Sequence, residues 1–281
     1  MNYLFVYNKK AGKRFEPSIV NQISALKPQS SDFSFIDIRK FESIDTSEYH
    51  VLCAIGGDGT VSTVAKIAHQ RNQILGIIPK GSGDGLARFL KIPRHTLKAL
   101  EIVLHGKQIT IDTAKVSNYF FLNVAGAGFE AEVAHKFGAG GIRGLTGYAK
   151  TIIQCFGERQ EKKISIVIDD EQAELPFFSL SIANGAQWGN NFEIASKADI
   201  QDGLLEIAIM KKPKWYQIPS LISFLIRKVQ KDNALFTFYK ASHISIKGSG
   251  KQWHIDGEPI TLRESKDIKV DINSLKVLVP K

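Results

Sequence analysis

Cysteine is scarce in this sequence: Cys53 and Cys155 are its only two cysteines in 281 residues. Two cysteines cannot form a disulfide framework, and Cys53 lies in an apolar stretch that predicts a buried strand. Long apolar runs are absent too, which excludes a membrane-spanning helix of about 20 residues. The apolar part of the N-terminus is too short for a signal peptide and predicts a first strand. These absences favour a protein of the cytoplasm.

The sequence patterns of several well-known sites are also missing. The seven histidines show no zinc-binding spacing, and no Ser-His-Asp context stands out. The P-loop pattern G-x-x-x-x-G-K-[ST] is absent, and so is G-x-G-x-x-G after the first predicted strand. Aromatic residues are not interleaved with Arg or Lys as in nucleic-acid-binding motifs. We therefore expect neither a zinc enzyme nor a P-loop protein, and no nucleic-acid partner.

Positive charge is in excess. There are 37 Lys and Arg residues against 28 Asp and Glu residues, which gives a formal net charge of +9. A basic surface favours anionic partners such as phosphates or acidic lipids, although ordinary solubility is the simpler explanation.

The first 110 residues or so alternate strand and helix patterns. Strands are predicted at 3–7, 33–38, 51–55 and 75–78, and helices near 16–26, after residue 60 and near 94–105. This alternation predicts an α/β domain with a parallel sheet and helices on both faces.

From about residue 109 the pattern changes to short, β-branched or aromatic segments separated by Gly, Asp or Asn. Such segments predict a largely antiparallel β-sandwich, with helical interruptions at 144–156 and 215–230. We expect a nucleotide-binding α/β domain of residues 1–112, with 274–281 as a candidate return to it, and a β-sandwich substrate domain of residues 113–273.

The stretch AIGGDGT (54–60) joins a predicted strand to a predicted helix. Ligands of open parallel sheets bind beyond the carboxyl ends of the strands, and glycine lets a ligand approach the backbone closely. Thr60 is expected to cap the helix, whose N-terminal amides attract an anion. Asp58 would be exposed there, to hold a metal ion bound to phosphate or to receive a proton. A plain tight turn is the alternative.

Two further polar loops follow predicted strands. GIIPKGSGDGLAR (76–88) repeats the order of apolar strand, glycine and hydroxyl loop, and helix, and YNKKAGK (7–13) follows the first strand. Three such loops at one sheet edge predict a nucleotide cradle. Its candidate residues are Asn8, Gly12, Lys13, Gly56, Gly57, Gly59, Thr60, Gly81, Ser82 and Gly83.

GGDGT followed by GIIPKGSGDGLAR resembles the catalytic domain of the diacylglycerol kinase and sphingosine kinase family, including its bacterial lipid kinase branch. The resemblance continues in order with NVAGAGFEAEVA (123–134), RGLTGYAK (143–150), ANGAQWGNNFEIASKADIQDGLLEI (183–207) and HIDGEPI (254–260), so it covers nearly the whole chain. GGDG alone also occurs in NAD kinases and phosphofructokinases. The whole series of motifs in this order is what is specific to the family.

The resemblance implies a nucleotide domain, a C-terminal β-sandwich and an active site in the cleft between them. It implies phosphoryl transfer from ATP to a hydroxyl of a lipid, such as diacylglycerol or a sphingoid base, with magnesium. Glu258 matches the proposed proton acceptor, and Asp58 competes for that role. The resemblance implies substrate contacts for Glu130, Glu132 and Arg88, and a structural magnesium site at Asp199, Asp202 and the backbone of Leu204.

The sequence departs from the family pattern in two loops. Lys9 follows Asn8 where the family usually has proline. In the second glycine loop, Gly85 stands at the second acidic position, and Asp84 lies one place earlier. These departures leave open an inactive homologue that binds a nucleotide or lipid.

The segment 211–231 has apolar residues at helical spacing and cations at both ends. It predicts either an interfacial helix on anionic lipid or a helix packed on the sandwich. The sequence as a whole predicts a cytoplasmic, ATP-dependent lipid kinase that visits the membrane surface transiently. An NAD kinase-like enzyme is the alternative, which the lack of an Asn-x-x-Asp adenosine motif disfavours. The lipid, the donor nucleotide and the oligomeric state, a homodimer included, stay open.

Overall fold

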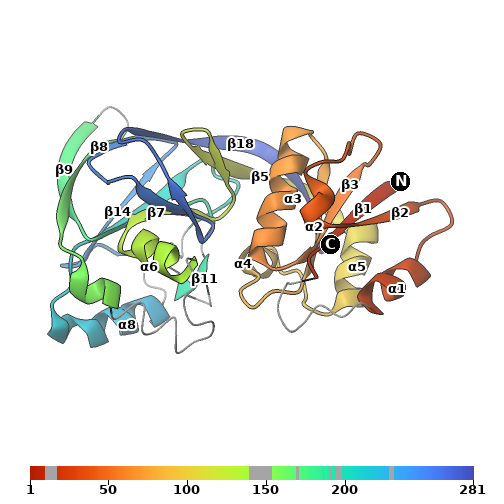
Figure 1. The fold of residues 1–281 in the computed structure, drawn as a ribbon, viewed down its shortest axis with the longest axis horizontal. Helices are drawn as coiled ribbons and strands as arrows, with labels where there is room; N and C mark the ends of the chain where they lie inside the picture. Colours follow the sequence, from red (N-terminus) through yellow and green to blue (C-terminus); the bar gives the residue numbers. More distant parts are fainter. Residues whose placement is uncertain are drawn as a thin grey trace. The chain divides into compact units, whose positions relative to one another are not determined.

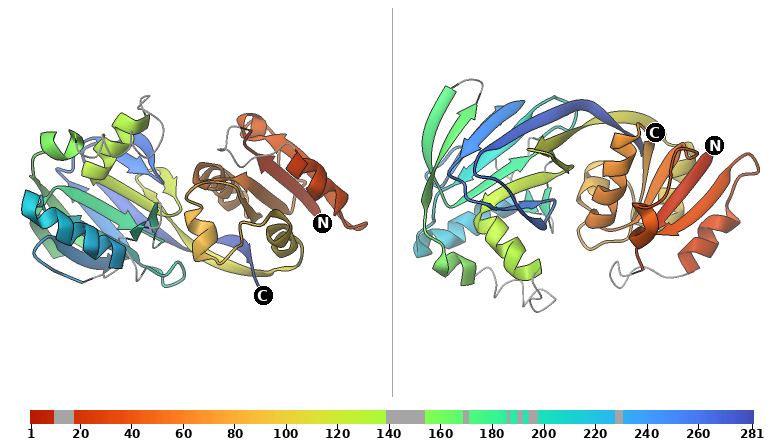
Figure 2. Two further views of the ribbon diagram at one scale, coloured as in Figure 1. Left: turned by 90° about the horizontal axis from the view of Figure 1, so that it is seen from below. Right: turned by 45° about the horizontal axis from the view of Figure 1, so that its top comes forward.

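The computed structural model describes residues 1–9, 18–138, 154–168, 171–185, 187–189, 192–193, 198–227 and 231–281. The chain forms two compact units (Figures 1 and 2). One contains Met1–Asp112 and Ile272–Lys281, and the other contains Thr113–Trp188 and Phe192–Asp271. No helix within these described ranges is long and apolar enough to cross a membrane.

The first unit is built on a parallel sheet with the strand order β2-β1-β3-β4, and the end of β18 lies next to β4. Lys276 and Val277 of β18 pair in parallel with β4. Every residue of β3 is buried, as expected of a central strand covered on both faces. The strands are β1 (Asn2–Tyr7), β2 (Asp32–Asp37), β3 (Val51–Gly56), β4 (Ile74–Pro79) and β18 (Lys266–Val279).

Helices cover both faces of this sheet, which confirms the predicted α/β class. Figure 1 shows α3 on one side of the sheet and α1 and α5 on the other. The buried residues of α3, Val61, Val64 and Ala65 among them, recur at the spacing of one helix face. The helices are α1 (Ser18–Ala25), α2 (Ile38–Phe41), α3 (Asp58–Gln70), α4 (Gly85–Phe89) and α5 (Thr96–His105).

One predicted boundary in this unit was wrong. The strand predicted at 33–38 ends at Asp37, and Ile38 begins α2. The cause is helix capping: a carboxylate oxygen of Asp37 accepts a hydrogen bond from the backbone N–H of Arg39 at 3.0 Å.

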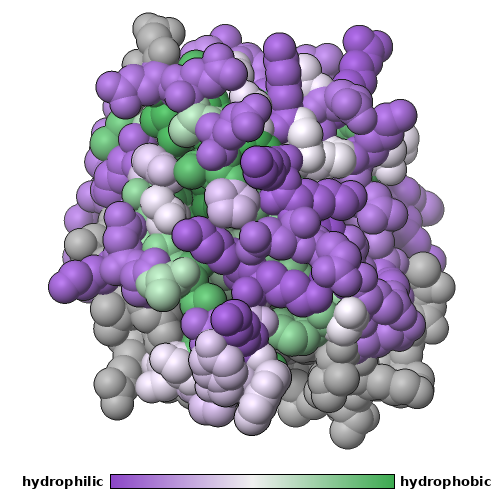
Figure 3. Space-filling model, turned by 90° about the vertical axis from the view of Figure 1, so that its left-hand side faces the viewer, coloured by the Kyte–Doolittle hydropathy of each residue, from purple (hydrophilic) through white to green (hydrophobic). Residues whose placement is uncertain are grey.

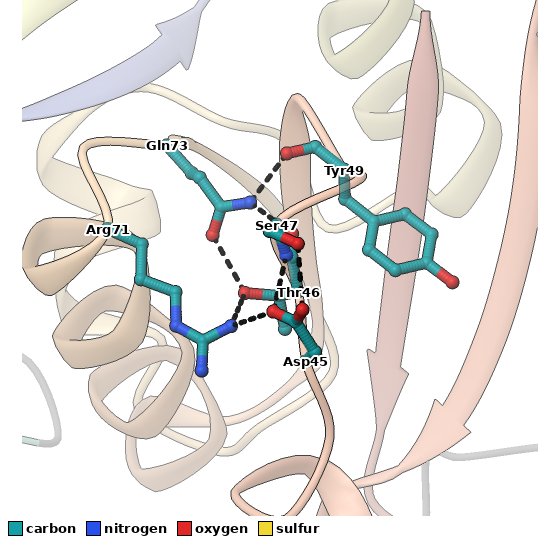
Figure 4. Close-up of polar contacts among 6 residues, drawn as sticks. All are labelled: Asp45, Thr46, Ser47, Tyr49, Arg71 and Gln73. Carbon is teal, nitrogen blue, oxygen red and sulfur yellow. Dashed lines mark hydrogen bonds and ion pairs between the residues drawn. The ribbon is translucent and has the colours of Figure 1, made fainter.

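A buried polar network fixes the end of the unit where β3 and β4 begin (Figure 4). Nε2 of Gln73 donates to the carbonyls of Thr46 at 2.6 Å and Tyr49 at 2.5 Å, and its Oε1 accepts from the Thr46 hydroxyl at 3.0 Å. Nη1 of Arg71 donates to that hydroxyl and to Asp45. The amino ends of these strands are thus held by side chains, which leaves the carboxyl ends to the glycine loops.

The second unit is a β-sandwich of two sheets, as predicted. One has the order β14-β13-β10-β7-β16-β17, and the other contains β18, β15, β8 and β9 together with β5 and β6. The strand pairs that define these sheets are antiparallel. Phe121, Phe177 and Trp253 are fully buried in the core of the unit.

The strands of this unit are β5 (Lys107–Val116), β6 (Tyr119–Phe121), β7 (Val124–Gly128), β8 (Lys162–Ile168), β9 (Glu171–Phe177), β10 (Ser179–Ala183), β11 (Gln187–Gly189), β12 (Phe192–Glu193), β13 (Leu205–Met210), β14 (Phe236–Ala241), β15 (His243–Lys247), β16 (Gln252–Ile255) and β17 (Glu258–Thr261). Helical segments are α6 (Phe129–Gly138), a turn at 154–158, η2 (Trp215–Gln217) and α8 (Ile218–Arg227). Of the predicted helix at 144–156, residues 144–153 lie outside the described residues.

Candidate nucleotide and substrate site

The two glycine loops of the first unit form one continuous surface. Asp58 joins them: its Oδ1 accepts from the backbone N–H of Gly85 at 2.6 Å, and its Oδ2 accepts from that of Asp84 at 3.0 Å. The loops also touch directly, because a Cβ atom on Gly81 would lie 2.5 Å from the Cα of Gly57. Only glycine at both positions allows this approach.

The helix after the first loop presents its N-terminus here, but Thr60 does not cap it. Gly57 is the N-cap residue, no side chain caps the helix, and α3 begins at Asp58. Thr60 is buried inside the first turn, beneath Gly56, where a Cβ would clash with its hydroxyl. The predicted capping role of Thr60 was therefore wrong, because the N-cap residue lies three positions earlier. The first-turn amides remain available to an anion, with the positive end of the helix dipole behind them.

An ion pair with a buried carboxylate shapes the second loop. Asp84 has a left-handed backbone (φ 54°), its Oδ1 accepts from the N–H of Gly81 at 2.7 Å, and its Oδ2 lies 2.9 Å from Nε of Arg94. Nη2 of Arg94 donates to the carbonyls of Ser82 at 2.8 Å and Gly83 at 3.3 Å. Burial raises the pKa of the Asp84 carboxyl, while the N–H of Gly81 and the Arg94 charge oppose that rise.

Sequence reasoning missed Arg94. A carboxylate placed inside a loop that must itself be rigid needs a cation, and Arg94 is a nearby residue able to supply a fork of donors. Arg94 holds the loop through two carbonyls and the Asp84 carboxylate, while Ser82 stays exposed.

The structure describes some of the other predicted residues of this unit and not others. Arg88 lies on α4, next to the second loop, and its charge lowers the pKa of Asp84. Asn8 follows β1 and is partly buried. Gly12 and Lys13 lie outside the described residues. The nucleotide-binding role of all these positions stays a prediction.

In the second unit, Glu258 opens β17 directly after a tight turn. Asp256 (φ 49°) and Gly257 (φ 86°) form that turn between β16 and β17. The carboxylate of Asp256 accepts three backbone N–H groups, from Leu122 at 3.0 Å and from the next two residues at 2.8 and 3.1 Å. Glu258 is exposed, and its carboxylate meets no hydrogen-bond donor among the described residues. The turn is thus rigid, and the carboxylate next to it is free.

Glu130 is buried in the second unit. Its carboxylate accepts from the Ser181 hydroxyl at 2.9 and 3.0 Å and lies 3.5 Å from Nε2 of His254. Ser181 and His254 flank Gly126 in the sheet, and a Cβ on Gly126 would overlap the Glu130 carboxylate. Glu130 therefore fills the space above Gly126 and fastens α6 to the sheet. Contact between Glu130 and a substrate stays a prediction.

Glu132 lies two positions further along α6, is partly exposed, and forms an ion pair with the buried guanidinium of Arg159. Nε of Arg159 also donates to the carbonyl of Phe178 at 2.7 Å. The predicted role of Glu132 in binding substrate stays open too.

At the predicted magnesium site, a lysine already contacts the acidic loop. Oδ1 of Asp202 accepts the N–H of Leu204 at 3.0 Å, and its Oδ2 lies 3.2 Å from Nζ of Lys240. The same ammonium lies 2.8 Å from the buried carboxylate of Glu206. Asp199 is exposed and accepts a backbone N–H within its own turn. Among the residues the structure describes, no three His, Cys, Asp or Glu side chains are grouped to hold a metal ion.

Comparison with known proteins decides the family. A model described as "Diacylglycerol kinase catalytic domain" matches residues 2–116, and one described as "YegS C-terminal NAD kinase beta sandwich-like domain" matches residues 123–279. The chain belongs to the diacylglycerol kinase family. The resemblance seen in the loop sequences is confirmed, and the coarse class that follows is a kinase.

Curated relatives agree at modest identity. The chain is 26% identical over 270 residues to a diacylglycerol kinase of Staphylococcus saprophyticus, which covers 90% of this chain and 87% of the relative. It is 29% identical over 237 residues to a protein of Pseudomonas aeruginosa named "Probable lipid kinase YegS-like", with coverage of 83% and 77%. A solved diacylglycerol kinase structure from Bacillus anthracis has a TM-score of 0.77 at 18% identity, covering 99% of this chain and 96% of that chain, and shows the shared fold.

Proposed function

We propose that this member of the diacylglycerol kinase family is an ATP-dependent lipid kinase. It transfers the γ-phosphate of ATP to a hydroxyl of a lipid such as diacylglycerol or a sphingoid base. The single observation that supports this most is the pair of glycine loops joined by Asp58, because it offers backbone amides and a helix N-terminus at one place on the sheet edge.

Phosphoryl transfer is mostly positioning and neutralisation of charge, and this site is built for positioning. Arg94 and Asp84 fix the carbonyls and one amide of the second loop, so few of its groups must reorganise when phosphate arrives. Magnesium, when bound with the nucleotide, would neutralise phosphate charge. The described side chains form no ready set of ligands for it, so we assign no step to a particular metal ligand.

We assign the proton acceptor to Glu258. Both carboxylate oxygens of Asp58 already accept backbone N–H groups from the second glycine loop, so neither oxygen is free to turn toward a lipid hydroxyl. Glu258 is exposed and free of such bonds among the described residues, and the Asp256 turn beside it is rigid. A carboxylate free to turn toward a hydroxyl suits general base catalysis.

An inactive homologue that binds nucleotide or lipid is the second candidate. It is favoured by Gly85, which brings no carboxylate to the second loop and uses its N–H to bind Asp58. An NAD kinase-like activity remains the third candidate because the sandwich domain model names that enzyme class.

The experiment is transfer of labelled phosphate. The purified full-length protein is incubated with γ-labelled ATP, magnesium and either a mixed lipid extract or NAD, and the products are separated by chromatography. Label in a lipid product supports the proposal, and the identity of that product names the lipid. Label in NADP would overturn it in favour of the soluble acceptor. Nucleotide binding without any transfer would favour the inactive homologue.

A further inference from the structure

Two large aromatic side chains stand in solvent on η2. Trp215 is 81% exposed and Tyr216 is 57% exposed. Their rings contact edge to face, with centroids 5.9 Å apart and an interplanar angle of 85°. Trp253, in contrast, is fully buried in the core. A pair of exposed rings held against each other marks an interaction surface, since packing inside the unit does not require it.

Cations surround this pair. The sequence KKPKWY (211–216) carries three lysines and no acid. Lys211 and Lys214 are exposed, and Nζ of Lys214 lies 5.9 Å from the centroid of the Tyr216 ring. Lys212 is partly committed, because its Nζ donates to the carbonyl of Arg159 at 2.6 Å. The surface therefore combines aromatic rings with the ammonium groups of Lys211 and Lys214, which form no hydrogen bond or ion pair with the residues that the structure describes.

The surface is hollowed beside the rings. A cavity of about 490 Å³ has Phe156, Pro213 and both aromatic rings in its walls, with Lys212, Lys214 and Glu161 at its polar positions. Glu161 is the one acid there, and it accepts the backbone N–H of Lys212 at 2.8 Å. Figure 3 shows this side of the second unit, where hydrophilic side chains cover most of the face and residues of intermediate hydropathy gather toward its lower edge.

We propose that η2 and the lysines before it dock onto a bilayer that contains anionic phospholipid. Tryptophan and tyrosine prefer the headgroup level of a bilayer, where the ring is shielded and its polar edge stays wet. Lysines next to them face the anionic headgroups. Charge decides against a second copy of this chain as the occupant, because two lysine-rich surfaces would repel each other.

Vesicle binding of the full-length protein tests this proposal. Sedimentation with vesicles of phosphatidylcholine containing about 30% phosphatidylglycerol should show binding, and vesicles of phosphatidylcholine alone should bind far less. W215S/Y216S should weaken binding at least ~10-fold. K211Q/K214Q should weaken binding roughly 30-fold at low salt, because each lysine near an anionic surface raises the affinity about fivefold and the two effects multiply. These side chains are exposed, so the variants should fold.

Matched controls use exposed residues elsewhere. Tyr119, which is 47% exposed on β6, is changed to Ser, and the exposed Lys98 is changed to Gln. Both variants should bind vesicles like the wild type. In bilayers with brominated lipid, tryptophan fluorescence should be quenched in the wild type and much less in W215F.

Equal vesicle binding by W215S/Y216S and the wild type would overturn the proposal. The proposal would also be overturned if the wild type bound no vesicles but formed a dimer in analytical ultracentrifugation, and W215S/Y216S did not form that dimer. None of these measurements needs phosphoryl transfer, so failure here is distinguishable from failure of the proposed kinase activity.

Discussion

Replacing Asp58 with asparagine should separate the two glycine loops. In the wild type each carboxylate oxygen accepts one backbone N–H, from Gly85 at 2.6 Å and from Asp84 at 3.0 Å. Asparagine keeps one acceptor oxygen and turns the other into an NH₂ group, which then faces an N–H as donor against donor. One hydrogen bond loses its charge and the other is lost.

The magnitude follows from these two bonds. A hydrogen bond to a charged group contributes about 1.5–3 kcal/mol, and a neutral one about 1 kcal/mol. Because Asp58 is partly exposed, we take the lower part of this range and expect a loss of about 2 kcal/mol. For a chain of this size that lowers the melting temperature by roughly 4–8 °C. Phosphoryl transfer should fall at least ~100-fold, because the loop amides lose their fixed positions.

Amide hydrogen exchange is the sharper assay. The N–H groups of Asp84 and Gly85 should exchange at least ~10-fold faster in Asp58→Asn than in the wild type, since each tenfold corresponds to about 1.4 kcal/mol of protection. The control is Asp45→Asn, because Asp45 also accepts a backbone N–H, from Ser47 at 3.0 Å, but its side chain is 77% exposed within one loop. Unchanged exchange at Asp84 and Gly85 together with lost transfer would refute the reasoning and give Asp58 a direct chemical role.

Three further predictions follow from the second unit. Glu258→Gln should keep ATP affinity while single-turnover transfer falls roughly 100- to 10,000-fold, and full transfer would return the base to Asp58. Burial of the Lys266 ammonium lowers its pKa to about 8. Below pH 8 Lys266 is protonated in both the folded and the unfolded state. Between pH 8 and the unfolded pKa near 10.4, the unfolded chain binds more protons than the folded one. The free energy of unfolding should therefore rise with pH over this range, by on the order of 3 kcal/mol. Urea unfolding from pH 7 to 10 should show this rise in the wild type and not in Lys266→Met. Lys240→Met should cost about 2 kcal/mol, more than Asp202→Ala, because it removes the ammonium that lies 2.8 Å from the buried Glu206 carboxylate. Equal losses in urea, or a melting temperature raised by magnesium in the wild type, would favour the metal site.

The fold class was predictable because the central elements carry strong patterns. β3 is buried at every residue and α3 follows it directly, so the apolar run and the helical spacing are both visible in the sequence. Two edge strands carry a much weaker strand signal. β9 and β17 lie at the ends of their sheets, and most of their residues are exposed or partly exposed, so they need few apolar side chains. Both strands also contain a proline, which in a sequence indicates the end of a strand but is tolerated in an edge strand of a sheet.

Helix α6 was missed for a related reason. Strand β7 runs to Gly128 and the helix begins at Phe129, with no polar linker between them to mark a boundary. Gly126 pairs with Ser181 on one neighbouring strand and with His254 on the other, and this arrangement makes room for Glu130. Only the folded sheet brings those positions together. A sequence pattern of local spacing contains no information of that kind, because the partners lie more than 50 residues apart.

Neighbouring polar residues of the site have different structural roles, which the sequence alone could not assign. In the turn after β16, Asp256 takes three amides and Glu258 takes none among the described residues, although both acids belong to one short motif. In the second glycine loop, Asp84 is buried against Arg94 while Ser82 stays exposed. The acid with buried partners shapes the loop, and its neighbour is left free for chemistry. Asp58 departs from this rule, since it is only partly buried yet both of its oxygens are engaged, and for that reason its substitution is the most informative test of how the site is built.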